Sequence, residues 1–341
     1  MTSSDKEKGP RFVLPERPKG CFAQNKPGPF SLVAALLMTA AGCGGSTPSE
    51  PGGAVPVVVS IQPQKWLVEQ IGGEHVEVIV LLAPGDDPHT YQPTDAQISR
   101  VMQASVYFRV GVPFENGPWF RAIAGSEKLE VIDTRQGIRL REVEADVHAH
   151  GPPPDEHAGD HGNHHDHAAR DPHIWTSPRL LKIQAQTVAA TLCELAPEHS
   201  DAFRRNVAAL ESRLDELDAR IRKKLVGCQG RAMFVFHPAW GYFADEYGLR
   251  QVAVELEGKE PTDRELTELQ QLARREGVRV IFVQPQISGQ SAEAIARAVG
   301  ARVEVLDPLA EDLPAELLRA AEVLAGSYRE PTSEPTEAGG K

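Results

Sequence analysis

The chain has 341 residues, of which 41% are hydrophobic and 25% charged, values typical of a folded globular protein. This length predicts one large domain or two domains of moderate size. The formal net charge of −12 argues against a protein that binds nucleic acid, because a phosphate backbone is bound by a basic surface.

The first 43 residues have the pattern of a signal peptide. Lys26 precedes an apolar run from Phe30 to Ala41, which is shorter than the roughly 20 residues that span a bilayer. The small residues directly before Cys43 resemble a bacterial lipobox, in which Cys43 is lipidated and becomes the mature N-terminus. A plain secretory signal with an unmodified cysteine is the alternative. We expect an exported protein, periplasmic or at the cell surface, that is anchored to the membrane through a lipid on Cys43.

Both ends of the mature chain are low in sequence complexity. Residues 44–54 are rich in glycine, proline and serine and are predicted to form a flexible tether, because such a segment cannot bury apolar surface. Residues 329–341 are predicted to be a disordered tail for the same reason. The folded part is therefore expected between these two segments.

Short apolar, β-branched runs alternate with helical patterns in two groups. The expected strands are residues 54–61, 76–82, 105–110 and 129–134 in the first group and 231–236, 250–256, 278–284 and 301–306 in the second. Alternating strands and helices form βαβ units, which build parallel sheets with helices on both faces. The sequence therefore predicts an α/β fold with two doubly wound parallel-sheet lobes, residues 55–176 and 228–328.

Residues 177–227 are predicted to form interlobe helices. Apolar residues recur at spacings of three and four along the second of them: Ala209, Leu210, Leu214, Leu217, Ile221 and Leu225. With Gly227 as its C-cap, this helix would have about 29 residues and a length of roughly 43 Å, which makes it a long, rigid connection between the lobes. A coiled-coil partner helix is the alternative, but the apolar stripe ends too soon for sustained heptads. Cys193 and Cys228 flank this helix and are expected to be two separate thiols.

Three of the twelve histidines lie at the ends of expected elements. His89 follows the second strand, His237 follows the first strand of the second lobe, and His173 precedes the first interlobe helix. Ligands of open α/β sheets bind outside the carboxyl ends of the strands. Both His89 and His173 stand in the sequence Asp-Pro-His, where proline stiffens the backbone ahead of the imidazole. Although a single loop histidine is usually a surface residue, the three together, at element ends in both lobes, predict a metal site.

Asp307 directly follows the last expected strand and is the natural fourth ligand. The less favoured carboxylates are Asp86, Asp87, Glu255 and Glu257. His75 and His199 have no comparable setting and are not included in the site.

Seven further histidines lie close together in residues 147–170, a stretch rich in glycine, proline and aspartate that is predicted to be a disordered loop of the first lobe. They are His148, His150, His157, His161, His164, His165 and His167. We expect them to be auxiliary weak metal sites that raise the ion concentration near His173. A low-complexity insertion without this role is the alternative.

Six segments occur in one order along the chain: "DPHTYQPT", "DPHIWTSP", "FHPAWGYFADEYGL", "EGKEPTDREL", "IFVQPQ" and "LDPLA". Together they resemble the metal-binding solute-binding proteins of ABC transporters, in the zinc-uptake, ZnuA-type branch, over residues 55–328. The resemblance implies two α/β lobes joined by one long helix, with the metal between them. The ligand positions of that family fall here on His89, His173 and His237, with Asp307 or a water as the fourth. In the manganese branch, the position of His237 is typically a glutamate.

The donor set and the resemblance together predict a zinc receptor. Imidazoles suit Zn²⁺, with Zn–N distances of about 2.0–2.1 Å, whereas manganese sites favour carboxylates. Because the imidazoles must be neutral, zinc affinity is expected to fall below a pH of about 6.5. We expect a monomeric, non-enzymatic receptor that hands Zn²⁺ to an ABC transporter permease with its cytoplasmic ATPase. The alternatives are a receptor for manganese or another divalent metal, an adhesin of the same fold, and a zinc-dependent hydrolase, although HExxH and GxSxG are absent from the sequence.

Overall fold

The computed structural model describes residues 53–142, 170–255, 262–286 and 289–329. The predicted signal peptide with Cys43, the tether up to residue 52, the seven clustered histidines, Glu257 and the tail from residue 330 lie outside these ranges. The described residues belong to one compact unit, which holds both sheets. None of the helices in the described ranges is long and apolar enough to cross a membrane.

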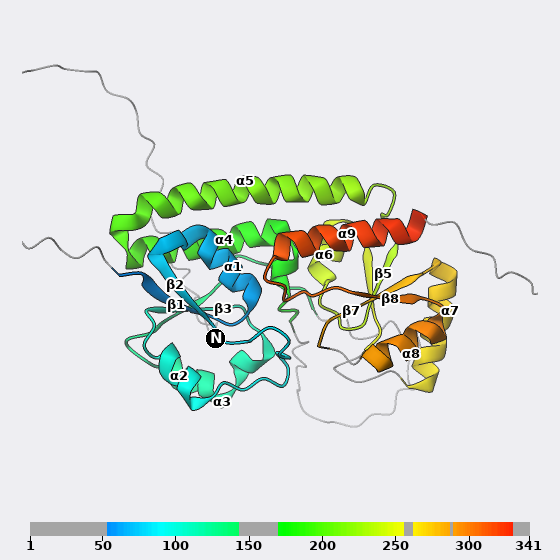
Figure 1. Ribbon diagram of the computed structural model, residues 1–341, viewed down its shortest axis with the longest axis horizontal. Helices are drawn as coiled ribbons and strands as arrows, with labels where there is room; N and C mark the ends of the chain where they lie inside the picture. Colours follow the sequence, from blue (N-terminus) through cyan, green and yellow to red (C-terminus); the bar gives the residue numbers. More distant parts are fainter. Residues whose placement is uncertain (1–52, 143–169, 256–261, 287–288, 330–341) are drawn as a thin grey trace, which may run out of the picture. The chain divides into compact units, whose positions relative to one another are not determined.

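Two four-stranded parallel sheets form the centres of the two lobes (Figure 1). The strands of the first lobe are β1 (Val55–Val59), β2 (Val76–Val80), β3 (Val106–Arg109) and β4 (Glu130–Asp133), in the order β2-β1-β3-β4. Those of the second lobe are β5 (Ala232–Val235), β6 (Arg250–Ala253), β7 (Val280–Val283) and β8 (Arg302–Val305), in the order β6-β5-β7-β8. All eight predicted strands are confirmed, because apolar and β-branched residues fill a sheet that is covered on both faces.

Helices connect these strands and cover the sheets. The first lobe contains α1 (Gln62–Gly72), α2 (Asp95–Val101) and α3 (Pro118–Ile123). The second lobe contains α6 (Gly241–Glu246), α7 (Asp263–Glu276), α8 (Gly289–Val299) and α9 (Leu313–Arg329). Both α2 and α7 begin with a threonine capping box, at Thr94 and Thr262. The predicted fold class, two doubly wound parallel-sheet lobes, is confirmed.

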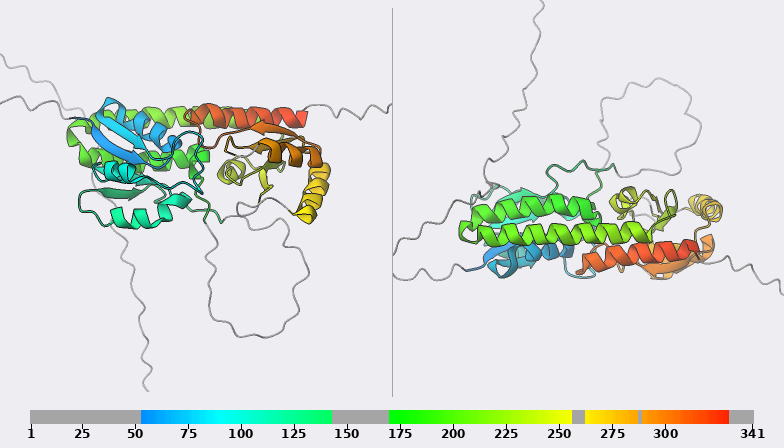
Figure 2. Two further views of the ribbon diagram at one scale, coloured as in Figure 1. Left: turned by 60° about the horizontal axis from the view of Figure 1, so that its bottom comes forward. Right: turned by 90° about the horizontal axis from the view of Figure 1, so that it is seen from above.

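Two helices, α4 (Pro178–Leu195) and α5 (Ser200–Lys224), connect the lobes. They pack side by side, and α5 also contacts α1 of the first lobe and α9 of the second (Figures 1 and 2). The 25 residues of α5 correspond to a length of about 38 Å. The long connecting helix is therefore present, although it is shorter than the sequence predicts.

The α5 helix ends with Leu225 as its C-cap, so the prediction that Gly227 is the cap is wrong. Gly227 lies instead in the following turn, with a φ of +83°. Ala209 is exposed, because it lies one position away from the buried face that contains Leu210 and Leu214. Cys193 lies near the end of α4 and Cys228 follows the end of α5, and these two described cysteines form no disulfide with each other, as predicted.

One hydrophobic core runs through the first lobe, the connecting helices and one face of the second sheet. The residues of β5 divide between two cores: Met233 and Val235 belong to this large core, whereas Ala232 and Phe234 belong to a smaller one that includes residues of α7 and α8. This alternation follows from the two-residue period of a strand. Because the large core is continuous from one lobe to the other, the connection between the lobes is packed and not merely tethered.

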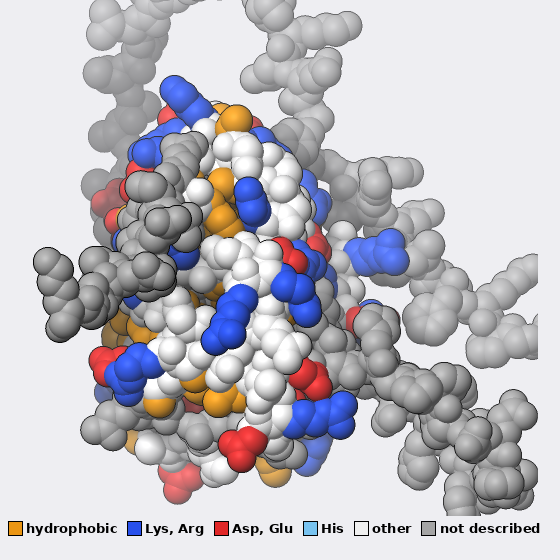
Figure 3. Space-filling view, turned by 90° about the vertical axis from the view of Figure 1, so that its right-hand side faces the viewer, with side chains coloured by type: hydrophobic (Ala, Val, Ile, Leu, Met, Phe, Trp, Pro, Cys, Tyr) orange, Lys and Arg blue, Asp and Glu red, His pale blue; other side chains and the backbone are white. Residues whose placement is uncertain are grey.

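Charges of both signs are interspersed on the end of the second lobe (Figure 3). Ion pairs join residues one turn apart within the helices there, such as Arg264 with Glu268 in α7 and Arg297 with Glu293 in α8. The excess of acidic residues in the chain is therefore not gathered on this face.

Candidate metal site

The imidazole rings of His89, His173 and His237 are neighbours, although they come from three segments far apart in sequence. His89 lies in the loop between β2 and α2, His237 follows β5, and His173 precedes the short 3-10 turn Ile174–Thr176. Nε2 of His89 lies 3.4 Å from Nε2 of His237, and their ring centroids are 4.9 Å apart. The ring centroid of His173 is 5.4 Å from that of His237. The structure thus brings the three predicted histidines together from both lobes.

The two Asp-Pro-His sequences form the same local turn. Oδ1 of Asp87 accepts a hydrogen bond from the backbone N–H of His89 at 2.9 Å. Oδ1 of Asp171 accepts one from the backbone N–H of His173, also at 2.9 Å. An aspartate that bonds the backbone two residues later is a common turn, and the intervening proline restricts the backbone between them. The repeated sequence therefore produces a repeated geometry in which the histidine follows a rigid turn.

Carboxylates also hold two of the rings. Oδ1 of Asp171 lies 2.8 Å from Nδ1 of His173, and Oε1 of Glu255 lies 2.5 Å from Nδ1 of His237. Asp171 and Glu255 are both buried. When Nδ1–H donates to a carboxylate, the lone pair of the imidazole is on Nε2, the nitrogen that is then available to a metal ion. Glu255 therefore orients the ring of His237.

Burial and neighbouring charges shift the pKa values at the site. Burial lowers the pKa of His89, and the neighbouring His237 lowers it further, so its neutral form is favoured. Burial by itself would raise the pKa of Asp171, but the hydrogen bond and charge of His173, together with Arg141, bring it below its usual value. Both shifts favour a neutral imidazole at His89 and a carboxylate at Asp171.

A tyrosine of the second lobe fastens the His173 segment to α6. The hydroxyl of Tyr242 donates to the carbonyl of Asp171 at 2.8 Å and accepts the backbone N–H of Arg141 at 2.9 Å. Burial raises the pKa of Tyr242 to about 12, so the hydroxyl keeps its proton near neutral pH. The guanidinium of Arg141 bonds the carbonyl of Gly241 and lies 2.9 Å from the carboxylate of Asp245. Because α6 begins shortly after His237, this contact connects the segments that carry His173 and His237.

Asp307 lies in the loop after β8, in a half-buried position. Its Oδ1 accepts the backbone N–H of Leu309 at 2.9 Å, and its pKa is raised by burial in spite of a hydrogen bond from Gln286. The next residue, Pro308, accepts a hydrogen bond from the indole of Trp175 at 2.6 Å, and the ring centroid of Trp175 is 5.2 Å from that of His173. The loop of Asp307 is thus linked to the His173 segment. The contacts among the described residues do not join Asp307 itself to any of the three imidazoles.

The remaining candidate residues take other positions. Asp86 accepts the backbone N–H of Ala83 at 3.2 Å in an exposed turn. Within the residues that the structure describes, no group of three or more histidine, cysteine, aspartate or glutamate side chains is arranged to hold a metal ion. The three imidazoles are therefore adjacent without forming a closed coordination sphere.

Sequence reasoning did not identify the ring-orienting roles of Asp171 and Glu255. For Asp171 a signal was present, because it precedes His173 by two residues as Asp87 precedes His89. For Glu255 the signal is not local: it follows β6, and only the pairing of β6 with β5 brings it to His237.

The two lobes have the same strand order and are connected by packed helices, and imidazoles from both lobes lie at one place. This combination defines the class of metal-binding solute-binding proteins. The chain belongs to the family described as ZnuA, zinc-uptake complex component A, periplasmic, which matches residues 57–321. The family is one of solute-binding receptors.

Solved structures and a bacterial relative agree with this assignment. A crystal structure of ZnuA is 37% identical and superposes with a TM-score of 0.70 over 80% of this chain and 98% of that one. A structure of a ZnuA deletion mutant with zinc bound has the same identity, coverage and TM-score. The high-affinity zinc uptake system protein ZnuA of Bacillus subtilis is 27% identical over 285 residues, which are 82% of this chain and 87% of that protein.

Proposed function

We propose that this chain is a high-affinity zinc receptor outside the cytoplasm that binds one Zn²⁺ through Nε2 of His89, His173 and His237. The observation that carries the proposal is the 3.4 Å between Nε2 of His89 and Nε2 of His237. Two nitrogens bound to one tetrahedral zinc at about 2.0–2.1 Å are about 3.3–3.4 Å apart. The two imidazoles therefore already have the separation that a shared zinc ion requires.

The oriented rings support zinc as the cargo. His173 and His237 have Nδ1 bonded to Asp171 and Glu255, which leaves Nε2 as the coordinating atom of each ring. Three nitrogen donors suit zinc better than manganese, which favours oxygen ligands. Asp307 is the proposed fourth ligand, with a water as the alternative. Four ligands close a tetrahedral site and leave no open position for a substrate, so the proposal includes no catalytic step.

Delivery requires partners outside this chain. The family is a periplasmic component of a zinc-uptake complex, and this supports an ABC transporter permease with its cytoplasmic ATPase as the receiver of the ion. Export and a lipid anchor on Cys43 remain part of the proposal, since they depend on residues 1–43. The seven histidines between His148 and His167 are proposed as weak auxiliary sites. Zn²⁺ bound weakly by these histidines would raise the local ion concentration close to His173 and so supply the tighter site.

The test is a calorimetric titration of the exported chain with Zn²⁺ and with Mn²⁺. We expect one tight zinc site in the wild-type protein, and we expect a variant with alanine at His89, His173 and His237 to lose it while weaker sites survive. A matched control replaces His75 and His199 with alanine, which removes two histidines outside the site and should leave the tight site intact. Tight zinc binding by the triple variant would contradict the proposed ligands.

A further inference from the structure

In the first lobe, the side chain of Glu115 occupies the place where an open α/β sheet typically binds its ligand. In the order β2-β1-β3-β4 the strand connections reverse direction between β1 and β3, and such sheets bind ligands beyond the carboxyl ends of the strands at this point. Ser60 directly follows β1, and Val110 and Gly111 directly follow β3. All three residues bond the carboxylate of Glu115, whose exposed fraction is only 1%.

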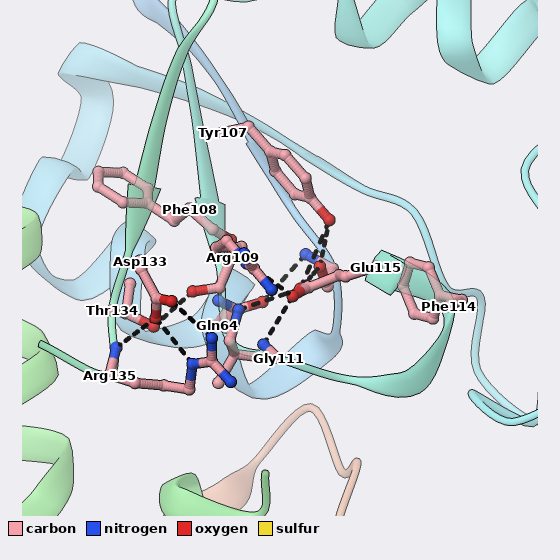
Figure 4. A network of polar contacts seen from close by, with 12 residues as sticks. Gln64, Tyr107, Phe108, Arg109, Gly111, Phe114, Glu115, Asp133, Thr134 and Arg135 are labelled. Carbon is pink, nitrogen blue, oxygen red and sulfur yellow. Dashed lines mark hydrogen bonds and ion pairs between the residues drawn. The ribbon is translucent and has the colours of Figure 1, made fainter. Parts of the chain in front are cut away.

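The carboxylate of Glu115 is held from several directions (Figure 4). Its Oε1 accepts the backbone N–H of Val110 at 3.0 Å and the hydroxyl of Ser60, and its Oε2 accepts the backbone N–H of Gly111 at 2.6 Å. Nε of Arg109 lies 3.4 Å from Oε2 and brings a positive charge. The site is therefore built for one carboxylate, which connects the end of β1 with the end of β3. Without this carboxylate, the donors would be left unpaired in the interior, which is costly.

Glu115 also fixes the turn that carries Phe114. Both residues belong to the 3-10 turn Pro113–Asn116. The ring of Phe114 packs edge-on against the ring of Tyr91, with centroids 4.9 Å apart and an interplanar angle of 70°. Tyr91 comes two residues after His89, so the turn held by Glu115 rests directly against the loop that carries this histidine.

Tyr91 in turn fixes the loop around His89. Its hydroxyl donates to the carbonyl of Leu81 at 2.8 Å, and its backbone N–H donates to the carbonyl of Asp87 at 3.0 Å. Asp87 is the residue whose side chain holds the backbone N–H of His89. A continuous series of contacts thus runs from the Glu115 carboxylate through Phe114 and Tyr91 to the turn of His89.

We propose that Glu115 is a positioning residue for zinc binding: its buried carboxyl group, bonded to the ends of both β1 and β3, holds Phe114 against Tyr91 and so keeps His89 at its short approach to His237. This inference rests on the proposed function, in which His89 is a zinc ligand. Glu115 touches neither the ion nor the imidazoles and acts only through these contacts.

The test compares zinc affinities, measured by competition with a chelating indicator, in variants of the exported chain. Glu115→Ala should weaken zinc binding about tenfold, the size of effect seen when a residue that orients a ligand is lost. Sodium acetate supplies the carboxylate and carbon that alanine lacks, so it should restore the affinity of this variant when compared with sodium chloride at equal ionic strength. Acetate should leave the wild-type protein and His89→Ala unchanged. Restored affinity would trace the loss to the missing carboxyl group, since acetate bound in its place also stabilises the folded state, and the variants below separate positioning from stability.

Two further variants keep the test decisive. Phe114→Leu removes the ring contact with Tyr91 while leaving the carboxylate, and it should also weaken zinc binding even if Glu115→Ala does not fold. The matched control is Thr134→Val, because Thr134 is equally buried and donates to the carbonyl of Arg109 at 2.9 Å within the same cluster, but does not contact Phe114. Its zinc affinity should equal that of the wild-type protein.

The outcomes separate this inference from the proposed function. If His89→Ala weakens zinc binding but Phe114→Leu and Glu115→Ala do not, the positioning role is overturned and the zinc site stands. Equal weakening by Thr134→Val would also overturn it, since the effect would then come from general loss of stability. If His89→Ala itself leaves the tight zinc site unchanged, the proposed ligand set fails.

Discussion

One oxygen atom of Asp171 holds His173 at two points. Oδ1 accepts the backbone N–H of His173 at 2.9 Å and lies 2.8 Å from its ring nitrogen Nδ1. In the corresponding turn, Oδ1 of Asp87 accepts the backbone N–H of His89 at 2.9 Å, and its carboxylate acts on the His89 ring through its charge. The two turns therefore share their backbone bond, while the aspartate interacts with the ring of its histidine differently in each.

Asp171→Asn is expected to weaken zinc binding by about 10- to 100-fold, because the neutral amide no longer supports the charge on a metal-bound imidazole. Asp87→Asn should change the affinity only a few-fold, since the amide oxygen can still accept the backbone N–H of His89. Competition with a chelating indicator measures both values. Equal losses in the two variants would contradict the difference between the turns.

A cysteine at position 307 can test whether this residue coordinates the metal ion. In Asp307→Cys, the sulfur is one bond closer to the backbone than the carboxylate oxygens, but a metal–sulfur bond of about 2.3 Å is longer than a metal–oxygen bond and offsets part of this difference. A thiolate bound to Co²⁺ gives an intense ultraviolet absorption. We expect this absorption when the variant is loaded with Co²⁺. The control is Asp312→Cys, because Asp312 is exposed and accepts the backbone N–H of Ala315. If neither variant shows the absorption, Asp307 is not a ligand and a water becomes the expected fourth donor.

The strands could be predicted because each one is marked by a short run of consecutive apolar, β-branched residues. Runs such as Val57–Val59 and Val280–Val283 are apolar on both faces, as parallel strands between helix layers must be. The three histidines could be predicted because their residue type suits a metal and because they lie at element ends, His89 and His237 after strands and His173 before a helix. The end of α5 could not, because a turn after Leu225 competes with the glycine signal at Gly227.

Contacts that depend on tertiary pairing could not be predicted from local sequence. Glu255 reaches His237 only because β6 pairs with β5 in register, which brings the ends of the two strands together. Phe114 reaches Tyr91 only because the carboxyl ends of β2 and β3 lie at the same edge of the sheet, on either side of β1. Neither relation has a fixed spacing in the sequence, so residue type alone does not identify it.

Asp133 should contribute stability that is lost in acid. Burial by itself would raise its pKa, but hydrogen bonds and charge from Arg135 lower it below the ordinary value of 3.8. The folded state therefore favours the ionised form, and the stabilisation is present above pH 3.8 and is lost as the pH falls through the folded-state pKa. Urea unfolding at a series of pH values should show a shallower acid decline for Asp133→Asn than for the wild-type protein. An unchanged decline would contradict the contribution of this ion pair.

Glu115 should make the folded protein less stable as the pH rises, whereas Asp133 makes it less stable as the pH falls. Burial raises its pKa above the ordinary value of 4.5, although Ser60 and two backbone N–H groups oppose the rise. The ionised form therefore costs folding free energy, and this cost develops as the pH rises above 4.5 through the folded-state pKa. Glu115→Gln should lose less stability than the wild-type protein as the pH rises from about 4.5 to 7. A steeper loss in the variant would contradict the sign of the shift.

His75 and His199 form a contact that can be separated from zinc binding. Their rings stack with centroids 3.8 Å apart and an interplanar angle of 12°, and both meet the ring of Phe203 edge-on, at 6.0 and 6.2 Å. This contact joins the end of the turn after α1 to the start of α5. We expect His199→Ala to lower the free energy of unfolding by about 0.5–1.5 kcal/mol, the usual value of an aromatic pair.

His199→Phe is the matched control for this pair, because it keeps an aromatic ring in the stack and removes the ring nitrogens. It should unfold at nearly the same urea concentration as the wild-type protein, and both variants should bind zinc with unchanged affinity. If zinc binding weakened in both variants, the nitrogens of His199 would contribute to binding and the proposed ligand set would be incomplete. Weakening in His199→Ala alone would instead mean that the stack, through its packing against α5, helps to hold the zinc site.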